Sequence, residues 1–364
     1  MFIFLCIIRV VFRQNSGKIM KIKIKKRYIS GLISLALLFW IFQKLDFQEI
    51  LGNLQHFDLK TLLFSIPLYF AGYMIRAKRW KTLMLSLPQL RSRTLMGITF
   101  IGYAINCFMP ARAGDFYRAH LTGSTFGISR VSVVSSILLE RILDGMVVFG
   151  FLLFVIVFFY HQPWLYKVAF SAGAVFVGVF AFIFWLVKCG NMEELFKKIT
   201  ALCKKFGLPT KFVNTMKKGT KHIASFVDGF EVLNKPKCLA NSFLLTIALW
   251  GVEAVFLFTI IKGFGLSLGL SAAVFLLCLT VFSSMIPSLS IHTGPYQCAF
   301  ILAMSVFNVD KEMAIAMAFV TQSIIITFLA VAGLFYMFRF HIKLKQIQAE
   351  LHEQKVNENI EIKA

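Results

Sequence analysis

The chain has 364 residues, of which 58% are hydrophobic and only 15% charged, and its mean hydropathy is +0.75. A soluble domain carries about 25% charged residues, so this composition excludes one and indicates a polytopic membrane protein, which we expect to be all-α. The formal net charge of +22 could suggest nucleic acid as a partner. In a membrane protein, however, it is the expected result of cytoplasmic loops rich in Lys and Arg, so we expect no nucleic-acid partner.

The first 27 residues form a basic segment that we expect to lie in the cytoplasm. Residues 1–12 are apolar and the basic residues follow them, whereas the basic residues of a signal peptide come first. We interpret Met20 as the true start, with residues 1–19 an upstream extension that is not translated.

Residues 28–338 are predicted to form the membrane domain, in which eight apolar stretches indicate helices. In chain order these are 28–45, 60–76, 95–109, 131–160, 165–187, 239–261, 270–286 and 314–338. Crossing a hydrocarbon core of about 30 Å takes about 20 residues at 1.5 Å per residue, which the first stretch just reaches.

The segments between these stretches are polar. Residues 46–59 form an acidic amphipathic link, and Trp80 with its basic neighbours in 76–81 resembles an interfacial anchor. The insert 188–237 has eleven lysines and four acids, which predicts amphipathic helices on the cytoplasmic membrane surface. Residues 339–364 are expected to be a cytoplasmic tail.

The charges of the loops conflict with a model in which every apolar stretch crosses the membrane. The basic segments 18–27, 76–93, 188–237 and 339–345 favour the cytoplasm, while the acidic segment 46–58 favours the outside. Eight plain crossings would put the lysine-rich insert outside. We therefore predict about six spanning helices and two re-entrant hairpins, with eight plain crossings and a weakly obeyed charge rule as the alternative.

The first predicted hairpin covers residues 95–130, enters from the cytoplasm and turns near Pro110 and Gly114. The second covers 270–307, enters from outside and turns between Pro287 and Pro295. Each half then consists of a span, a broken hairpin and a span, in opposite orientations. This is the arrangement of inverted-repeat transporters, whose substrate sites lie where interrupted helices meet.

Two short segments place charges inside apolar stretches, where each charge costs about 3 kcal/mol and usually faces a partner, a cavity or a substrate path. The candidate site residues in and beside them are Asn106, Pro110, Arg112, Gly114, Asp115, Arg118, Glu140, Arg141 and Asp144. Three arginines and three acids would form a formally neutral cluster. Either the ion pairs clamp the hairpin to its neighbouring helix, or the arginines bind phosphate through their guanidinium forks, and one network could do both.

The second half has fewer candidates. Glu253 is a lone acid in an apolar stretch, expected to be either protonated or paired, and His292 is either a hydrogen-bonded loop histidine or a proton relay. Pro287, Gly294 and Gln297 complete this set. No nucleotide-binding Gly-x-x-x-x-Gly-Lys loop, no His-Glu-x-x-His and no Cys-x-x-Cys occurs, so we expect no cofactor and no metal.

Four features of the sequence form one pattern: Asn106-x-x-x-Pro-x-Arg-x-Gly-Asp115, Arg118, Glu140-Arg-x-x-Asp-Gly, and a Pro-x-x-x-x-x-x-Gly turn at Pro287. This pattern resembles the lysylphosphatidylglycerol synthase transmembrane-region family. This is the flippase-like domain of the multiple-peptide-resistance proteins, and the resemblance covers about residues 28–338. It implies a lipid translocator. The second turn departs from the family, whose Pro-Gly-Gly-x-Gly run is usually closed by a glutamate, since Gln297 stands near the place of that acid.

We therefore expect a lipid translocator in the plasma (inner) membrane, with both termini in the cytoplasm. Its substrate would be a phospholipid or a polyprenyl-phosphate-linked lipid, with Arg112, Arg118 and Arg141 binding the head group. Only 26 residues follow Phe338, so we expect no aminoacyl transferase domain, and no catalytic motif favours an enzyme. The alternatives are a membrane component of, or accessory to, a lipid-modifying transferase partner, and a scaffold that uses the lysine-rich insert.

Overall fold

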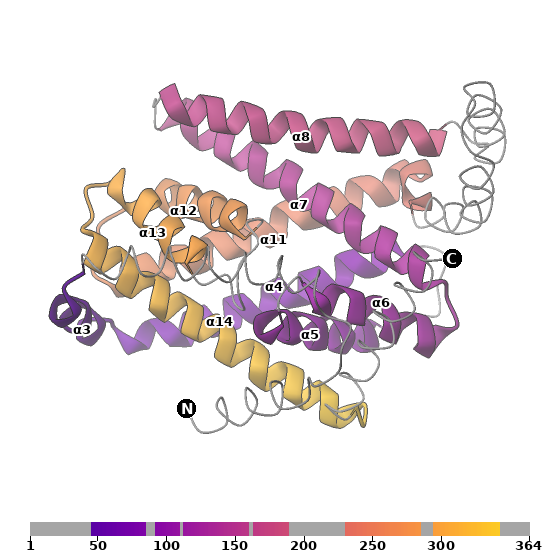
Figure 1. Cartoon of the computed structure of the whole chain (residues 1–364), viewed down its shortest axis with the longest axis horizontal. Helices are drawn as coiled ribbons and strands as arrows, with labels where there is room; N and C mark the ends of the chain where they lie inside the picture. Colours follow the sequence, from indigo (N-terminus) through magenta and orange to yellow (C-terminus); the bar gives the residue numbers. More distant parts are fainter. Residues whose placement is uncertain are drawn as a thin grey trace, which may run out of the picture.

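The computed structural model describes residues 45–84, 92–109, 112–159, 163–188, 230–284 and 294–342. Every regular element in these ranges is a helix, which confirms the all-α class (Figure 1). The basic N-terminal segment, most of the first apolar stretch, most of the lysine-rich insert and the tail from residue 343 lie outside the described residues.

The helix boundaries follow the apolar stretches closely. The helices are α3 (Phe47–Gln55), α4 (Leu62–Leu83), α5 (Ser92–Phe108), α6 (Ala113–Phe126), α7 (Arg130–Phe158), α8 (Pro163–Lys188), α11 (Pro236–Gly263), α12 (Leu270–Ser283), α13 (Pro295–Ser305) and α14 (Lys311–Arg339). Two 3-10 turns, η1 (Leu59–Thr61) and η2 (Glu231–Asn234), precede α4 and α11. The acidic link is helical as predicted: Asp46 caps α3 by accepting hydrogen bonds from the backbone N–H groups of Gln48 and Glu49.

Two pairs of short helices, α5–α6 and α12–α13, are flanked by longer helices along the chain. Helices α7 and α14 have 29 residues and α11 has 28, and among the described helices these three are long and apolar enough to cross a membrane. Helices α5, α6, α12 and α13 have 17, 14, 14 and 11 residues. At 1.5 Å per residue they measure about 17 to 25 Å, less than a hydrocarbon core of about 30 Å. The structure thus contains two hairpins of short helices, α5–α6 and α12–α13.

The two central helices, α4 and α11, pack against each other in opposite directions. Ser65 near the start of α4 lies 3.0 Å from Thr259 near the end of α11, and Arg79 near the end of α4 donates to Thr246 in the first half of α11. Helices α7 and α14 also run opposite ways along the molecule (Figure 1).

The packing partners of the first half recur in the second half. The pairs α4–α5, α5–α6 and α6–α7 correspond to α11–α12, α12–α13 and α13–α14. Each hairpin also packs on the last long helix of the other half, since α5 contacts α14 and α12 contacts α7. The α12–α13 hairpin lies toward the α3 end of the molecule and α5–α6 toward the opposite end (Figure 1).

The first hairpin closes tightly because two glycines face each other. A Cβ atom built on Gly114 would overlap the carbonyl oxygen of Gly102, and one built on Gly102 would overlap the side chain of Arg118. The return helix α6 ends at Gly127, whose φ of 67° lies in the left-handed region that glycine adopts readily.

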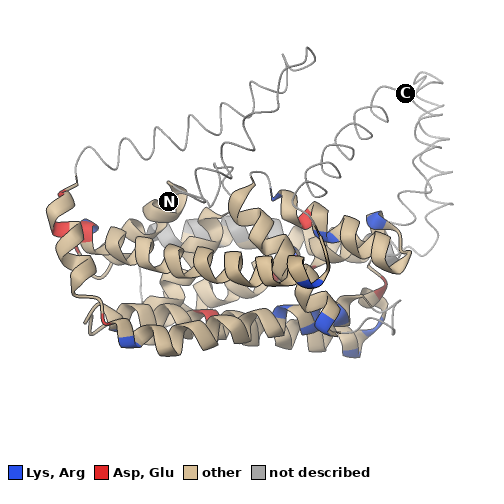
Figure 2. Cartoon of the chain, turned by 90° about the horizontal axis from the view of Figure 1, so that it is seen from below, with Lys and Arg blue, Asp and Glu red and all other residues tan. Residues whose placement is uncertain are grey.

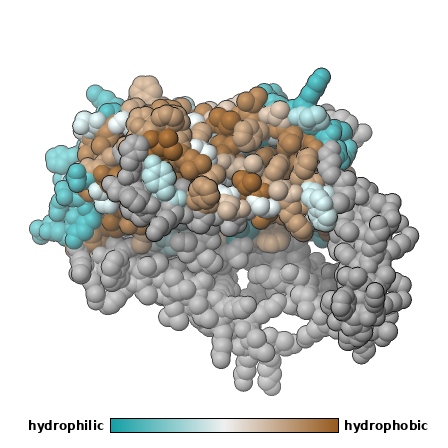
Figure 3. Space-filling view, turned by 90° about the horizontal axis from the view of Figure 1, so that it is seen from above, coloured by the Kyte–Doolittle hydropathy of each residue, from teal (hydrophilic) through white to brown (hydrophobic). Residues whose placement is uncertain are grey.

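The outer surface is that of a membrane protein. An apolar belt lies between hydrophilic ends in the space-filling view (Figure 3). The acids of α3 lie at one end, and most of the Lys and Arg residues lie toward the other (Figure 2).

Candidate functional site: a buried network of arginines and carboxylates

Helix α4 contributes two arginines that sequence analysis placed at the membrane surface. The predicted interfacial anchor is wrong: Arg76, Arg79 and Trp80 are buried, and Arg79 and Trp80 are fully so. The physical reason is that α4 continues to Leu83 and packs its last turns against α7 and α11, where carboxylates neutralise the two guanidinium groups.

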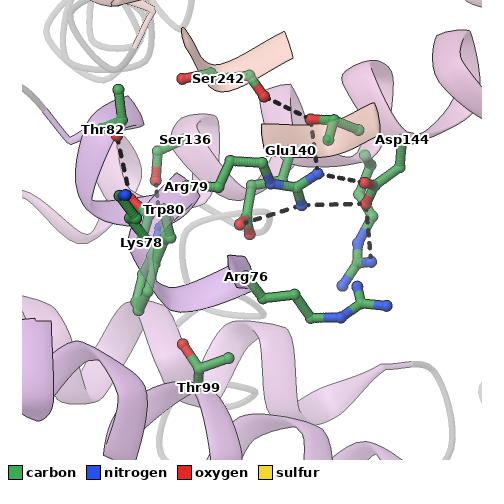
Figure 4. Close-up of polar contacts among 12 residues, drawn as sticks. Arg76, Lys78, Arg79, Trp80, Thr82, Thr99, Ser136, Glu140, Asp144 and Ser242 are labelled. Atoms are coloured by element: carbon green, nitrogen blue, oxygen red, sulfur yellow. Dashed lines mark hydrogen bonds and ion pairs between the residues drawn. The ribbon is translucent and has the colours of Figure 1, made fainter. Parts of the chain in front are cut away.

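Arg79 lies between the two acids of α7. Its Nη1 donates to Asp144 Oδ1 at 2.5 Å and to Thr246 Oγ1 at 3.0 Å, and its Nη2 lies 3.4 Å from Glu140 Oε1 (Figure 4). The four-residue spacing of Glu140 and Asp144 puts both carboxylates on one helix face, as predicted, so one guanidinium can bridge them.

Arg118 of α6 is buried and packs against Trp80 of α4. Its guanidinium carbon lies 4.1 Å from the centre of the Trp80 ring, and its Nη2 donates to Glu140 Oε2 at 3.1 Å. Trp80 in turn donates from Nε1 to Ser136 Oγ at 3.1 Å. The first hairpin is therefore attached to α4 and α7 by an ion pair and a cation–π contact.

Asp115 attaches the start of α6 to α7. It accepts a hydrogen bond from Asn106 Nδ2 at 3.1 Å and pairs with Arg141 Nη2 at 3.2 Å. Asn106 also accepts from the backbone N–H of Gly114 at 2.8 Å, so the amide joins the two arms of the hairpin. Arg141 keeps 25% of its side chain exposed, more than Arg76, Arg79 or Arg118.

Tyr103 of α5 stands at the centre of the network, a role that sequence analysis missed. Its hydroxyl accepts hydrogen bonds from Arg76 Nη1 at 3.3 Å and Arg141 Nη2 at 3.2 Å. Its ring centre lies 5.3 to 5.6 Å from the guanidinium carbons of Arg76, Arg118 and Arg141. No charge marks this residue in the sequence, so only its contacts reveal it.

Glu253 of α11 is paired, which decides between the two alternatives for this acid. It forms an ion pair with Arg76 of α4. The neighbouring Trp250 donates from Nε1 to Asp144 Oδ1 at 3.0 Å. Helix α11 therefore contacts both Arg76 of α4 and Asp144 of α7.

Arg112 differs from the other arginines of the site. It has a left-handed conformation with φ of 52°, at the position preceding α6. Its Nη2 lies 3.3 Å from both the carbonyl oxygen and the hydroxyl of Ser284, where α12 ends. Arg112 thus connects the start of α6 to the end of α12. Among the described residues it has no carboxylate within ion-pair distance.

The expected neutrality of the cluster is therefore wrong. Within the described part of the chain, Arg76, Arg79 and Glu253 join the six predicted charges, which makes five arginines and four carboxylates. The excess positive charge belongs to Arg112. Sequence analysis could not count this excess, because it assigned the arginines of α4 to an interfacial anchor and treated Glu253 of α11 as a lone acid.

Several buried N–H groups of the network lack an acceptor within the described part of the chain. They are Nε of Arg76, Arg79, Arg118 and Arg141, and Nη1 of Arg118. A buried donor without an acceptor costs about 1 to 3 kcal/mol, and more when it is charged. Such a set calls for water or an anion at the site.

The second hairpin has an uncharged polar contact near its tip. Gln297 accepts from the backbone N–H of Gly294 at 2.7 Å and donates to Gln322 of α14 at 2.9 Å. Gly294 has φ of 97°, which favours glycine at this turn. Pro110, Pro287 and His292 lie outside the described residues.

No described residues form a group of three or more His, Cys, Asp or Glu side chains that could hold a metal. Residues 265–269 read Gly-Leu-Ser-Leu-Gly, a match to the Gly-x-Ser-x-Gly pattern of serine hydrolases. They follow helix α11 and precede helix α12, whereas the hydrolase pattern requires a preceding strand. We therefore assign no catalytic role to Ser267 on the basis of this match.

Comparison with known proteins places this geometry in a family. The model of the family described as "Lysylphosphatidylglycerol synthase TM region" matches residues 27–333. The chain belongs to this family. It is also 24% identical over 309 residues to UPF0104 membrane protein MJ1595 of Methanocaldococcus jannaschii, covering 82% of the present chain and 90% of that protein. No solved structure matches the chain.

The family match and the apolar helices together identify a membrane protein. The match spans both hairpins and the whole buried network, so the arginines and carboxylates described above lie within the family domain.

Proposed function

We propose that the protein moves a lipid head group between the two leaflets of the membrane, with the lipid tails left in the bilayer. The observation that carries this proposal is Arg112, which has no carboxylate partner among the described residues and connects the start of α6 to the end of α12. An arginine inside hydrocarbon needs an anion, and a phosphate matches the planar guanidinium fork.

The proposed path lies between the hairpins. We propose that α5–α6 and α12–α13 enter the membrane from opposite sides as re-entrant hairpins, and that the two halves form an inverted repeat. Their short helices, the antiparallel α4–α11 pair and the recurring packing partners support this arrangement. A two-fold axis relating antiparallel neighbours runs perpendicular to them, hence in the membrane plane.

The arginines have different proposed roles. Arg112 and the partly exposed Arg141 contact the phosphate, while the buried Arg118 supports them from beneath Trp80. Asn106, Gly114 and Asp115 shape the first tip, and Glu140 and Asp144 hold the arginines in place. The buried N–H groups without acceptors are then satisfied by water or by the head group.

An apolar groove offers a place for a lipid tail. It has a volume of about 280 Å³ and lies between α7, α8 and α11, lined by Leu143, Met146, Phe180, Pro236, Leu239, Ala240 and Phe243. Leu143 directly precedes Asp144 of the buried network, so the groove is close to the charged site. We propose that one acyl or prenyl chain rests there while the head group occupies the network.

The proposed orientation follows the distribution of charge. We propose that the basic end of the molecule faces the cytoplasm of a plasma (inner) membrane, that the acidic helix α3 faces outside, and that both chain termini are cytoplasmic. The alternative function, a membrane component of or accessory to a lipid-modifying transferase, is favoured only by the word "synthase" in the family description.

The test is the initial rate of lipid movement in proteoliposomes at matched protein content. Arg112→Lys keeps the charge but loses the fork, so it should retain partial transport, and Arg112→Ala should nearly abolish it. Arg130→Ala, at the exposed start of α7, is the matched control and should transport like the parent. If Arg112→Ala also transports like the parent, Arg112 does not bind the head group.

A further inference from the structure

All four carboxylates of the network are already compensated. Asp115 pairs with Arg141, Glu140 with Arg118 and Arg79, Asp144 with Arg79, and Glu253 with Arg76. Arg112 is the site arginine left without a carboxylate among the described residues. Residues 285–293, which follow its contact Ser284 in the sequence, include no Asp or Glu.

The second half of the molecule has an uncharged pair where the first half has a charged one. Asp115 is the third residue of α6 and pairs with Arg141, the twelfth residue of α7. Gln297 is the third residue of α13 and bonds to Gln322, the twelfth residue of α14. The two contacts occupy equivalent positions, and the second adds neither a charge of its own nor a counter-charge for Arg112.

We propose that the translocated group is a phosphodiester, which carries a single negative charge. This inference rests on the proposed function and specifies its substrate class. One phosphodiester anion compensates the one excess arginine and leaves the buried site neutral. A second negative charge, as on a phosphomonoester dianion or a diphosphate, would remain uncompensated at a depth where charge is costly.

Two lipid classes share this chemistry, namely phospholipids such as phosphatidylglycerol and polyprenols joined to a sugar through one phosphate. Phosphatidic acid is the informative comparison because it has a phosphomonoester. The second pKa of a phosphomonoester is about 6, so this lipid changes from monoanion toward dianion as the pH rises, whereas a phosphodiester keeps one charge.

The experiment measures initial rates in proteoliposomes at pH 5 and pH 8 for three tail-labelled lipids: phosphatidylglycerol, phosphatidic acid and a polyprenyl-phosphate sugar. The phosphatidylglycerol rate should be the same at both pH values. The phosphatidic acid rate should fall about tenfold or more at pH 8, because two pH units above its second pKa of about 6 only about one molecule in a hundred is still a monoanion. The polyprenyl-phosphate sugar shows which of the two lipid classes is the substrate: whichever of it and phosphatidylglycerol moves faster represents the preferred class. Phosphatidic acid that moves as fast as phosphatidylglycerol at pH 8 overturns the proposal.

A charge variant and a binding assay make the test independent of transport. Arg112→Gln leaves no excess positive charge, so it should lose the thermal stabilisation by short-chain phosphatidylglycerol at pH 8, and Arg130→Gln should keep it. If no lipid moves at all, translocation itself is refuted, and thermal stabilisation by short-chain lipids decides the charge question. Greater stabilisation by phosphatidylglycerol than by phosphatidic acid at pH 8 supports a monoanion site, while the reverse order or equality refutes it.

Discussion

Replacing Arg79 by glutamine tests whether the network holds the fold together. Arg79 is fully buried and lies within 3.4 Å of oxygen atoms from Asp144, Glu140 and Thr246. The substitution removes the cation that bridges the two acids of α7 and leaves Asp144 with Trp250 and the more distant Arg141, 3.7 Å away.

The expected loss is large. Removing one partner of a buried ion pair costs about 3 to 5 kcal/mol, because the other charge stays buried without compensation. At about 1.4 kcal/mol per tenfold, the ratio of folded to unfolded protein falls by a factor of about a hundred to several thousand. Lys78, one residue earlier and exposed, is the control, and Lys78→Gln should change stability by less than about 0.5 kcal/mol.

The assay is reversible unfolding of purified protein in mixed micelles with increasing denaturing detergent. Adding Asp144→Asn to Arg79→Gln removes one negative charge along with the positive one and should recover part of the loss. If Arg79→Gln unfolds at the same detergent fraction as Lys78→Gln, the network contributes no stability and the account of α4 is mistaken.

Three further predictions concern the hairpin, the groove and the topology. Gly114→Ala should lower the folded yield, because the added Cβ would overlap the Gly102 carbonyl oxygen. The control Gly150→Ala has no atom within 4 Å of its added Cβ and should be neutral or stabilising by up to about 1 kcal/mol. Equal yields of the two variants would contradict the close approach of the two glycines. Ala240→Phe should slow lipid movement without lowering the unfolding midpoint, and an unchanged rate would argue against a tail in the groove. On a cysteine-free background, cysteines at Ser92, Ser129 and Thr200 should be labelled only from the cytoplasm and one at Asn53 only from outside; labelling of Ser129 from outside would remove the first re-entrant hairpin.

Much of the fold was predictable because hydrophobic stretches mark helices directly. The stretch 131–160 corresponds to α7 at 130–158, and the stretch 314–338 to α14 at 311–339. The polar interruption after Asn106 likewise ends α5 at Phe108, and Gly114 allows the return arm to pack closely.

The composition of the site was only partly predictable. Glu140 and Asp144 could be placed on one helix face by their spacing, but their partner Arg79 lies 61 and 65 residues away in the sequence. A positively charged residue at the end of an apolar stretch is typical of an interfacial anchor, and nothing local distinguishes it from a buried one.

The equivalence of the two halves also became visible only through contacts. Gln297 was a candidate because it stands near the place of the family's glutamate, but nothing in the sequence indicated Gln322 as its partner. Their position opposite each other, matching Asp115 and Arg141, shows that the halves share a contact geometry and differ in charge. This difference locates the excess charge at Arg112 rather than at both hairpin tips.

The most direct test of lipid translocation uses purified protein in liposomes that contain a trace of phosphatidylglycerol with a fluorescent label and an impermeant quencher added outside. We predict that the parent protein exposes the inner-leaflet lipid to the quencher, that Arg112→Ala leaves it protected, and that the lipid recovered afterwards is chemically unchanged. Inner-leaflet lipid that stays as protected with the parent protein as in protein-free vesicles would contradict the proposed function.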